Sequence, residues 1–392
     1  MQRIYTKMKK YILSFILTTS GYAQELINLQ ENVQDFVLET KRISIPSYPD
    51  AFNPSIVRWK DRLLLSFRTR GTTTKAHFVG FIWLDEQFEP ISNPQLLQSN
   101  NANTICQDPR LLVINDRLYM AYNDLVTFDE IQTRRMFFSE VLYENNRFYL
   151  HEPQPLPGPW DPDPETTEFN AFIKHRQKNW VPFTYNNEVL LSYTLEPHQI
   201  VSLNNNTTFA IRFASENSSC WSLGELRGGT QAIKLDNCYL GIFHSCKILA
   251  TQNSNGKKMR HYFMGAYTFK PEPPFEITHI SPRPIVGNGF YDGCMDYPTW
   301  TDLRVVFPTG CIDDEKHVWV TYGRQDFESW VMKLDKKLLL ESLIPCNKPN
   351  IFAEPLEIKK LPRRPNNAHR HKKQQIARKR SLGRVQKVAL KL

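Results

Sequence analysis

The strongest constraint on the fold is a hairpin pattern that recurs five times. Each copy has an apolar run, a short polar turn and a second run of β-branched and aromatic residues, as hairpins require. The copies span 54–70, 109–124, 180–194, 229–244 and 307–322, and their turns lie at Lys60-Asp61, Asn115-Asp116, Asn186-Asn187, Asp236-Asn237 and Asp313-Asp314. A unit that recurs at this spacing indicates one repeated architecture.

The repeat predicts an all-β fold, a five-bladed β-propeller. Five units over residues 24–352 leave about 66 residues for each, enough for a four-stranded blade with its loops, and a closed ring of such sheets protects their edges. A two-sheet sandwich is the structural alternative, but it does not explain why the unit recurs. Two stretches are expected to be insertion loops: 151–170, rich in proline and acidic residues, and 282–296, whose glycines follow no phosphate-loop spacing.

Charge is placed unevenly along the chain. The 392 residues carry a formal net charge of +9, but residues 353–392 hold 13 Lys and Arg against two acids, and the core at 24–352 has a net charge of −6. A mildly acidic core argues against a nucleic-acid groove. The basic tail at 353–392 is interpreted either as a solvated disordered extension or as a segment that contacts an anionic surface or nucleic acid.

The N-terminus and the cysteines bear on compartment and metal content. Residues 1–23 have basic residues, an apolar run at 11–17 and small residues at Gly21 and Ala23, which is the pattern of a signal peptide. The alternative, an uncleaved anchor, is disfavoured because about a dozen apolar residues cannot span a hydrocarbon core of ~30 Å. We therefore expect a secreted or periplasmic protein. The seven cysteines follow no paired metal-ligand spacing, so we predict no metal and assign no disulfide pairs.

Polar residues stand at the same place in several hairpins. Asn53, Asp108, Asn179 and Gly228 each lie eight positions before a turn, and a second polar set follows the other strand of the hairpin. The start of one strand and the end of its antiparallel partner meet at one end of a hairpin, and in a propeller these ends surround one mouth of the central channel. The residues expected there are typical of a pocket for a polyhydroxylated ligand with acid–base capability: Asn53, Arg68, Arg70, Asp108, Asn123, Asp124, Lys178, Asn179, Glu196, His198, Arg227, His244 and Asp326.

Each of these residues also has a purely structural interpretation. An Asp before Pro at the start of a strand is often a turn former, and a lone Lys or Arg is often a solvated charge. A lone His is more often a structural hydrogen-bonding group than a catalyst. Only the shared offset in separate repeats indicates a functional mouth.

Several short motifs follow one another in a specific order between Asn53 and Asp326. They are Phe52-Asn53-Pro54-Ser55, Phe67-Arg68, Gln107-Asp108-Pro109-Arg110, Lys178-Asn179-Trp180, Glu196-Pro197-His198, Gly228-Gly229-Thr230, Phe243-His244-Ser245, Met264-Gly265-Ala266, and Tyr322-Gly323 with Asp326. In this order they resemble glycoside hydrolase family 130, the β-mannoside phosphorylases and related β-mannosidases, which are five-bladed propellers. The resemblance implies an inverting enzyme acting on β-mannosides without a cofactor, with inorganic phosphate as co-substrate if it is a phosphorylase.

The resemblance also implies roles for individual residues. Asp108 is the general acid, acting on the glycosidic oxygen through the 3-hydroxyl of the sugar. The substrate-binding set is Asn53, Arg68, Lys178, Asn179, His198, Tyr322 and Asp326, with Arg227 and His244 on the phosphate or leaving-group side. The family usually has Glu before this Asp, whereas this chain has Gln107. A neutral neighbour removes a like charge that would raise the pKa of Asp108.

The acceptor of the sugar remains open. Inverting cleavage needs an acid for the leaving oxygen and a nucleophile on the opposite face. Phosphate needs cations and one catalytic carboxylate, whereas water needs a second carboxylate as base ~6.5–9.5 Å away, for which Glu196 and Asp326 are the candidates. Export favours hydrolysis or transfer of mannose to another sugar, and the cations favour phosphate. The alternative from another class is a catalytically silent glycan-binding propeller, for which Gln107 is one reason.

Overall fold

Strands dominate the part of the chain that the computed structural model describes, which is residues 26–31, 33–70, 77–98, 106–128, 131–158, 177–203, 209–293 and 303–346. The predicted signal segment at 1–23 and the basic tail at 353–392 lie outside these residues, as does most of the predicted insertion at 151–170. Within the described ranges, no helix combines the length and the apolar composition needed to cross a membrane.

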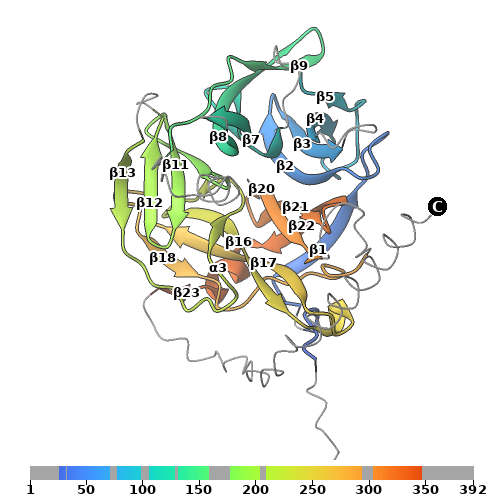
Figure 1. The fold of residues 1–392 in the computed structure, drawn as a ribbon, viewed down its shortest axis with the longest axis vertical. Coiled ribbons are helices and arrows are strands. Elements are labelled where there is room, and N and C mark those ends of the chain that lie inside the picture. Colours follow the sequence, from blue (N-terminus) through green and yellow to red (C-terminus); the bar gives the residue numbers. More distant parts are fainter. Residues whose placement is uncertain are drawn as a thin grey trace, which may run out of the picture. The chain divides into compact units, whose positions relative to one another are not determined.

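The described strands form five sheets (Figure 1). The first holds β2 (Phe52–Trp59), β3 (Arg62–Arg70), β4 (His77–Leu84) and β5 (Gln95–Leu96). The second holds β6 (Gln107–Ile114), β7 (Arg117–Phe128), β8 (Ile131–Glu144) and β9 (Arg147–His151). The third holds β10 (Val181–Tyr185), β11 (Glu188–Leu195), β12 (His198–Ser202) and β13 (Ile211–Ser215).

The last two sheets are built less simply. The seven-stranded fourth sheet joins β14 (Arg227–Gly228), β16 (Tyr239–Leu249), β17 (Met259–Phe269), β18 (Ile277–Ile280) and β23 (Ile344–Pro345), with β15 (Ile233–Lys234) on β16 and β19 (Leu303–Arg304) on β17. The fifth holds β20 (Val306–Asp314), β21 (His317–Arg324), β22 (Glu328–Asp335) and β1 (Val37–Ile43). Two short helices, η1 (Gln252–Ser254) and α3 (Lys336–Ser342), lie between strands.

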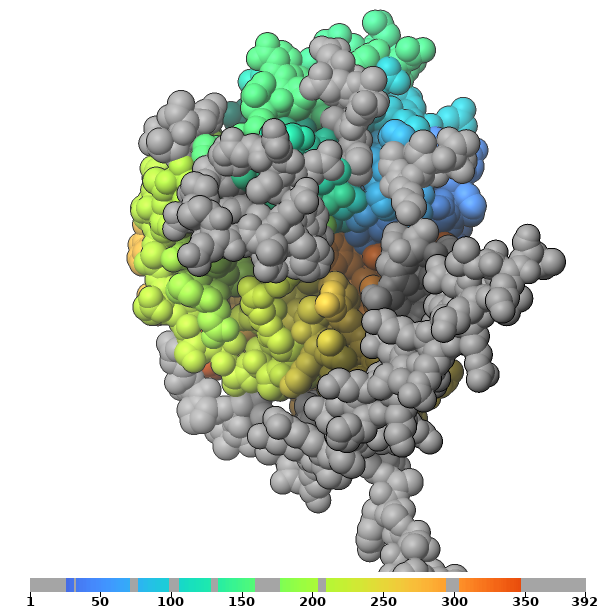
Figure 2. All heavy atoms as spheres, in the orientation of Figure 1, coloured from blue at the N-terminus to red at the C-terminus, as the bar shows by residue number. Residues whose placement is uncertain are grey.

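Neighbouring sheets contact one another in the manner of a propeller. The contacts run from β2 to β6, from β6 to β10, from β11 to β14, from β17 to β20, and from β20 back to β2. Figure 2 shows the same succession on the surface, from the blue first sheet through green to yellow. The predicted all-β propeller class is thus confirmed. Four sheets have the four-stranded form expected of a blade, and the seven-stranded sheet departs from it.

All five predicted hairpins are present in the strand pairing. At three predicted turns, Lys60-Asp61, Asn115-Asp116 and Asn186-Asn187, both residues have positive φ, between 48° and 63°. This is the backbone of the type I′ turn, which is common in two-residue hairpin loops because its twist matches the right-handed twist of the flanking strands. The fifth predicted turn is wrong by two residues. Asp313 and Asp314 pair with Val318 and His317, so β20 continues through both and the chain turns at Glu315-Lys316.

The N-terminal strand completes the fifth sheet. β1 pairs with β22, while β20, β21 and β22 come from the C-terminal part of the described chain. Joining strands from both ends of the chain in one sheet covers the edge that β22 would otherwise expose. Apolar residues between the sheets, such as Phe81 and Phe148 stacked at 4.5 Å, fill the core.

Candidate functional site

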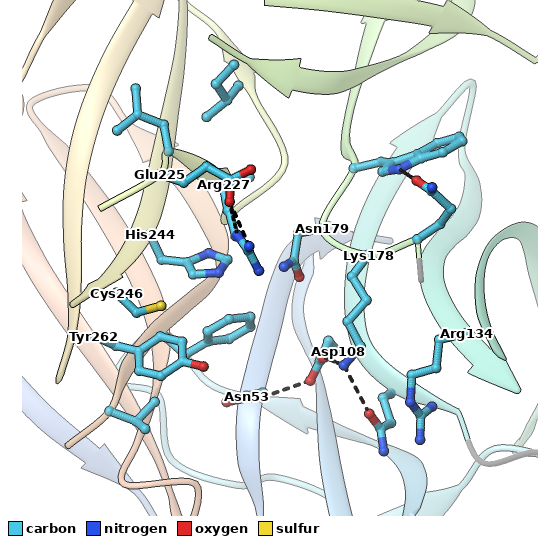
Figure 3. A pocket seen from close by; sticks show the side chains of 18 of the residues that line it. Asn53, Asp108, Arg134, Lys178, Asn179, Glu225, Arg227, His244, Cys246 and Tyr262 are labelled. Carbon is cyan, nitrogen blue, oxygen red and sulfur yellow. Dashed lines mark hydrogen bonds and ion pairs between the residues drawn. The ribbon is translucent and has the colours of Figure 1, made fainter. Parts of the chain in front are cut away.

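All five sheets contribute to one polar cavity of about 840 Å³ (Figure 3). Most residues expected at the mouth line it, although the hairpins that carry them lie far apart in the sequence. The predicted site residues in its wall are Asn53, Arg68, Asp108, Lys178, Asn179, Glu196, Arg227, His244 and Asp326. Within the described residues, the shared offset in the hairpins therefore corresponds to a shared place in space.

A repeated backbone feature explains that offset. Asn53, Asp108 and Asn179 have φ values of 49°, 54° and 66°, in the left-handed region that Asn and Asp tolerate better than other non-glycine residues. The pairing register shifts immediately after Asn53 and after Asp108, as in a β-bulge. A bulge changes the direction of a side chain at the end of a strand. The left-handed backbone is thus common to the three hairpins, and two of them add a register shift where the polar side chain enters the cavity.

Glycine is required at two positions where the backbone passes very close to Asn53 or Asn179. A Cβ on Gly323 would lie 2.1 Å from the Asn53 side-chain oxygen, and one on Gly228 would lie 2.2 Å from the Asn179 carbonyl oxygen. Both distances are far shorter than van der Waals contact. Glycine at these two positions lets the sheets approach closely enough to form the cavity wall.

Asp108 is the most heavily hydrogen-bonded carboxylate of the cavity. Its Oδ1 accepts from Asn53 at 2.9 Å and from Arg68 at 2.8 Å. Its Oδ2 accepts from Asn123 at 3.3 Å and lies 3.6 Å from the Lys178 ammonium nitrogen. Both carboxylate oxygens therefore face donors. The side chain is only 5% exposed, so this set forms an ion-paired centre in the wall.

The two carboxyl groups of the site have opposite pKa shifts. Burial acts to raise the pKa of Asp108, but the charges of Arg68 and Lys178 and the Asn53 amide hold it well below its usual range. Burial raises the pKa of Asp326, an effect that Arg68 opposes and Asp108 reinforces. Asp108 is therefore ionised, and Asp326 is the easier of the two to protonate.

Sequence reasoning missed the residues that hold Arg68 in place. The Nδ1 atom of His77 accepts from Arg68 Nε at 3.1 Å, and burial together with Arg68 and Arg70 lowers the pKa of His77 to about 3. The ring is therefore neutral. Gln107, with its amide oxygen turned toward the guanidinium groups, accepts from Arg68 and Arg134, each at 2.9 Å. Neither His77 nor Arg134 stands at the repeated offset, so no sequence signal marked them.

The opposite side of the cavity is built on the fourth sheet. Figure 3 shows Arg227, His244, Cys246 and Tyr262 facing the side that carries Lys178 and Asp108. Arg227 donates to Glu225 at 2.7 Å. His244 is 2% exposed and its Nδ1 has no partner among the described residues, while burial, Arg110 and Arg227 lower its pKa to about 3. This side offers a cation and a neutral imidazole to a ligand.

Two predicted substrate-binding residues lie away from the wall. His198 is fully buried, with Nε2 2.9 Å from Ser192 Oγ and Nδ1 2.7 Å from the Phe275 carbonyl oxygen. Both ring nitrogens are thus engaged inside the sheet. Tyr322 is fully buried and packs on Phe290 in the apolar core, 4.9 Å between ring centroids. We therefore correct the expectation that these two side chains line the pocket: inward strand positions placed them in the core.

The two candidate bases differ in their surroundings. Glu196 is exposed at the edge of the cavity and accepts from the backbone and hydroxyl of Ser219 at 2.7 and 3.2 Å. Asp326 lies in the turn between β21 and β22 and follows Gln325, both with positive φ. The Asp326 carbonyl oxygen accepts from Arg70 at 2.8 Å. Of the two, Asp326 is the carboxyl held inside the cavity.

Comparison with known proteins identified similar structures but no similar sequences. No family model and no curated protein matches this chain. One similar structure is a mannose phosphorylase from Leishmania mexicana in complex with phosphate ion, with a TM-score of 0.55 and 14% identity over 79% of this chain and 92% of that chain. Another represents the GH130 family of mannoside phosphorylases, which contains glycoside hydrolases that target β-1,2 mannosidic linkages in Candida mannan. Its TM-score is 0.53, at 12% identity over 80% and 94%.

A third similar structure is a GDP-Man-dependent mannosyltransferase from Leishmania mexicana, with a TM-score of 0.51 and 11% identity over 77% of this chain and 90% of that chain. At these identities the comparisons concern the fold. They confirm the expectation drawn from the motifs, that this chain has a fold like that of glycoside hydrolase family 130. Function has to be argued from the cavity itself.

Proposed function

We propose that this family-130-like propeller is a carbohydrate-active enzyme that acts on β-mannosides with inversion, using Asp108 as its catalytic carboxyl. The observation that carries the proposal is the position of Asp108 in the wall of a polar cavity, where Arg68, Lys178 and two amides converge on it. The similar structures include a mannose phosphorylase, a mannosyltransferase and a family with mannoside hydrolases, which supports mannosides as substrates. The seven-stranded sheet serves as the fifth blade of the ring.

Asp108 has to carry a proton in the complex in order to act as general acid. Its pKa is well below the usual range, so it is a carboxylate at neutral pH. A neutral sugar bound beside Asp108 would exclude water and separate it from Lys178, and both changes raise the pKa. The proton then passes to the leaving glycosidic oxygen, directly or through the sugar 3-hydroxyl, as the nucleophile attacks the opposite face of the anomeric carbon.

The acceptor is assigned to the side of the cavity that carries Arg227 and His244. Arg227 is a half-exposed cation that suits phosphate and also the hydroxyl groups of a second sugar, and the neutral imidazole of His244 lies in the same part of the wall. Water as acceptor would require a second carboxylate, for which Asp326 is better placed than Glu196. Residues 1–23, interpreted as an export signal, favour water or a sugar as acceptor. Phosphorolysis outside the cytoplasm would make a sugar phosphate where the phosphorylated product is wasted. A secreted form whose N-terminal sequence begins at Gln24 would support this assignment.

The decisive experiment is incubation of the purified protein with β-1,2- and β-1,4-mannobiose, with and without phosphate. Two free mannose molecules per disaccharide would identify water as the acceptor. One mannose with one mannose phosphate would identify phosphate, and released mannose with longer oligosaccharides would identify a sugar. Asp108→Asn should lower kcat by about 1,000-fold, the scale of general acid catalysis. Asp313→Asn, which removes an exposed carboxylate paired with Lys336, is the matched control and should keep full activity. No turnover of either linkage, with no effect of Asp108→Asn, would refute the proposal.

One observation favours a second candidate function, a non-catalytic glycan-binding propeller. Both oxygens of Asp108 face donors, so this group is arranged as a hydrogen-bond acceptor. Binding without turnover needs only such an acceptor. Calorimetric binding of mannobiose that persists in Asp108→Asn, with no product in either protein, would select this alternative.

A further inference from the structure

Arg110 is buried beside the backbone of Asp108 and does not line the cavity. It belongs to β6, two residues after Asp108, and its side chain is fully buried. Its Nη1 donates to the Asp108 carbonyl oxygen at 3.2 Å, and its Nη2 donates to Asn179 Oδ1 and the Gly228 carbonyl oxygen, each at 3.2 Å. Its Nε donates to the carbonyl oxygen of Gly229. One guanidinium therefore uses its whole fork on groups of three different chain segments.

These segments are the equivalent places in three successive sheets. Asp108, Asn179 and Gly228 each stand eight residues before a hairpin turn, and the first two have left-handed backbones. A non-glycine residue persists in this conformation only where its surroundings fix it. Arg110 supplies such fixation for the Asp108 backbone, and it ties the Asn179 amide, which lines the cavity, to the same frame.

The charge of Arg110 also acts on the site. Burial lowers the pKa of Arg110 to about 10, an effect that the Asp108 charge opposes, so the guanidinium is protonated at neutral pH. Arg110 is in turn one of the charges that lower the pKa of Asp108, after Arg68 and Lys178. The side chain thus links the geometry and the protonation of one carboxyl group.

We propose that Arg110 is a positioning residue, which holds the Asp108 backbone and the Asn179 amide in register across three sheets for the reaction in the cavity. The catalytic part of this inference rests on the proposed function, whereas its structural part does not. Lysine at this position keeps a charge but lacks the planar fork that reaches three segments at once. Glutamine lacks the charge as well. The two substitutions therefore separate geometry from electrostatics.

Kinetics and titration of the full-length protein test the proposal. Arg110→Lys should lower kcat by about 100-fold, the effect expected of a small misplacement of a catalytic group, with a smaller change in KM. Arg110→Gln should in addition raise the pKa of the Asp108 carboxyl, followed by carbon-13 NMR of labelled aspartate and assigned with Asp108→Asn. This titration needs no substrate, so it tests Arg110 even if the protein turns over no mannoside.

The matched control is Arg304→Lys. Arg304 is another buried arginine that donates to two backbone carbonyls, those of Asn253 at 2.7 Å and Gly293 at 3.0 Å, and it does not line the cavity. Its substitution should lower the unfolding temperature but keep kcat per folded molecule within about twofold of the wild type. Equal kcat losses in Arg110→Lys and Arg304→Lys, or an unchanged Asp108 titration in Arg110→Gln, would overturn the proposal. If Arg110→Gln does not fold, the kinetics of Arg110→Lys still decide it.

Discussion

A neutral amide occupies the place beside Asp108 where the resembling family usually has a carboxylate. With its amide oxygen turned toward the guanidinium groups, Gln107 accepts from both Arg68 and Arg134 at 2.9 Å, as a carboxylate at this position could, but it adds no negative charge. The sequence indicated that Gln stands here in place of Glu. Its hydrogen bonds with Arg68 and Arg134 show what this change does to the charge of the site. With Gln107 neutral, Asp108 has no adjacent carboxylate to share Arg68 and Lys178 with, in keeping with its low pKa.

Gln107→Glu should therefore raise the pKa of Asp108, because it adds a like charge next to it and shares its cations. If the protonated Asp108 is the active form, kcat/KM falls as the pH rises through this pKa. The fall should then move to higher pH in the variant, which a pH profile of kcat/KM with mannobiose measures. Gln199→Glu, which adds the same charge outside the cavity wall, should leave the profile in place. A Gln107→Glu profile that coincides with the wild type would contradict the expectation.

At the scale of elements, short-range sequence specified the hairpins well. Asn115-Asp116 and Asn186-Asn187 adopt the left-handed turn that their residue types favour, because Asn and Asp tolerate positive φ. The pair Asp313-Asp314 is a misleading signal, because both residues extend β20 and the chain turns two residues later, at Glu315-Lys316. Acidic residues occur both at exposed strand ends and in turns. Composition therefore does not distinguish a strand end from a turn, and the pairing register does.

Asn187→Val should lower the free energy of unfolding by about 1–2 kcal/mol, since a β-branched residue is strained in the left-handed region. Asn187 has a φ of 63° in the turn between β10 and β11. Asn187→Gly, which has no Cβ to strain, is the control and should stay close to the wild type. Denaturant unfolding of both variants measures the difference, and equal stability of the two would show that the turn is not strained.

At the scale of the whole molecule, the first described strand joins a sheet whose other strands come from residues 306–335. β1 covers β22, and it carries Ile43, which is 2% exposed. Nothing in the local pattern of residues 37–43 indicated this partner, because the strand lies outside the five repeated hairpins. Long-range pairing of this kind is decided by which sheet edge remains open when the ring forms.

Removal of β1 should therefore destabilise the protein far more than removal of the predicted signal segment. A chain that begins at residue 45 loses the burial of Phe36 and Ile43, which corresponds to about 3–6 kcal/mol of unfolding free energy. It also exposes an edge that can pair between molecules. A chain that begins at Gln24 is the control. Thermal unfolding and light scattering compare the two, and equal stability would rule out closure of the ring by β1.

The sequence by itself determined the repeated hairpins, four of their five turns, and Asp108 as the carboxyl at a repeated polar offset. These features depend on hydrogen bonds and backbone preferences within some twenty residues. The tertiary structure decided which side chains enter the cavity: it admitted Arg134 and His77, kept His198 and Tyr322 inside the sheets, and placed Arg110 beside the backbone of Asp108. It also decided the low pKa of Asp108, because charges from other sheets set it. Contacts between sheets depend on how whole blades pack, which no local pattern encodes.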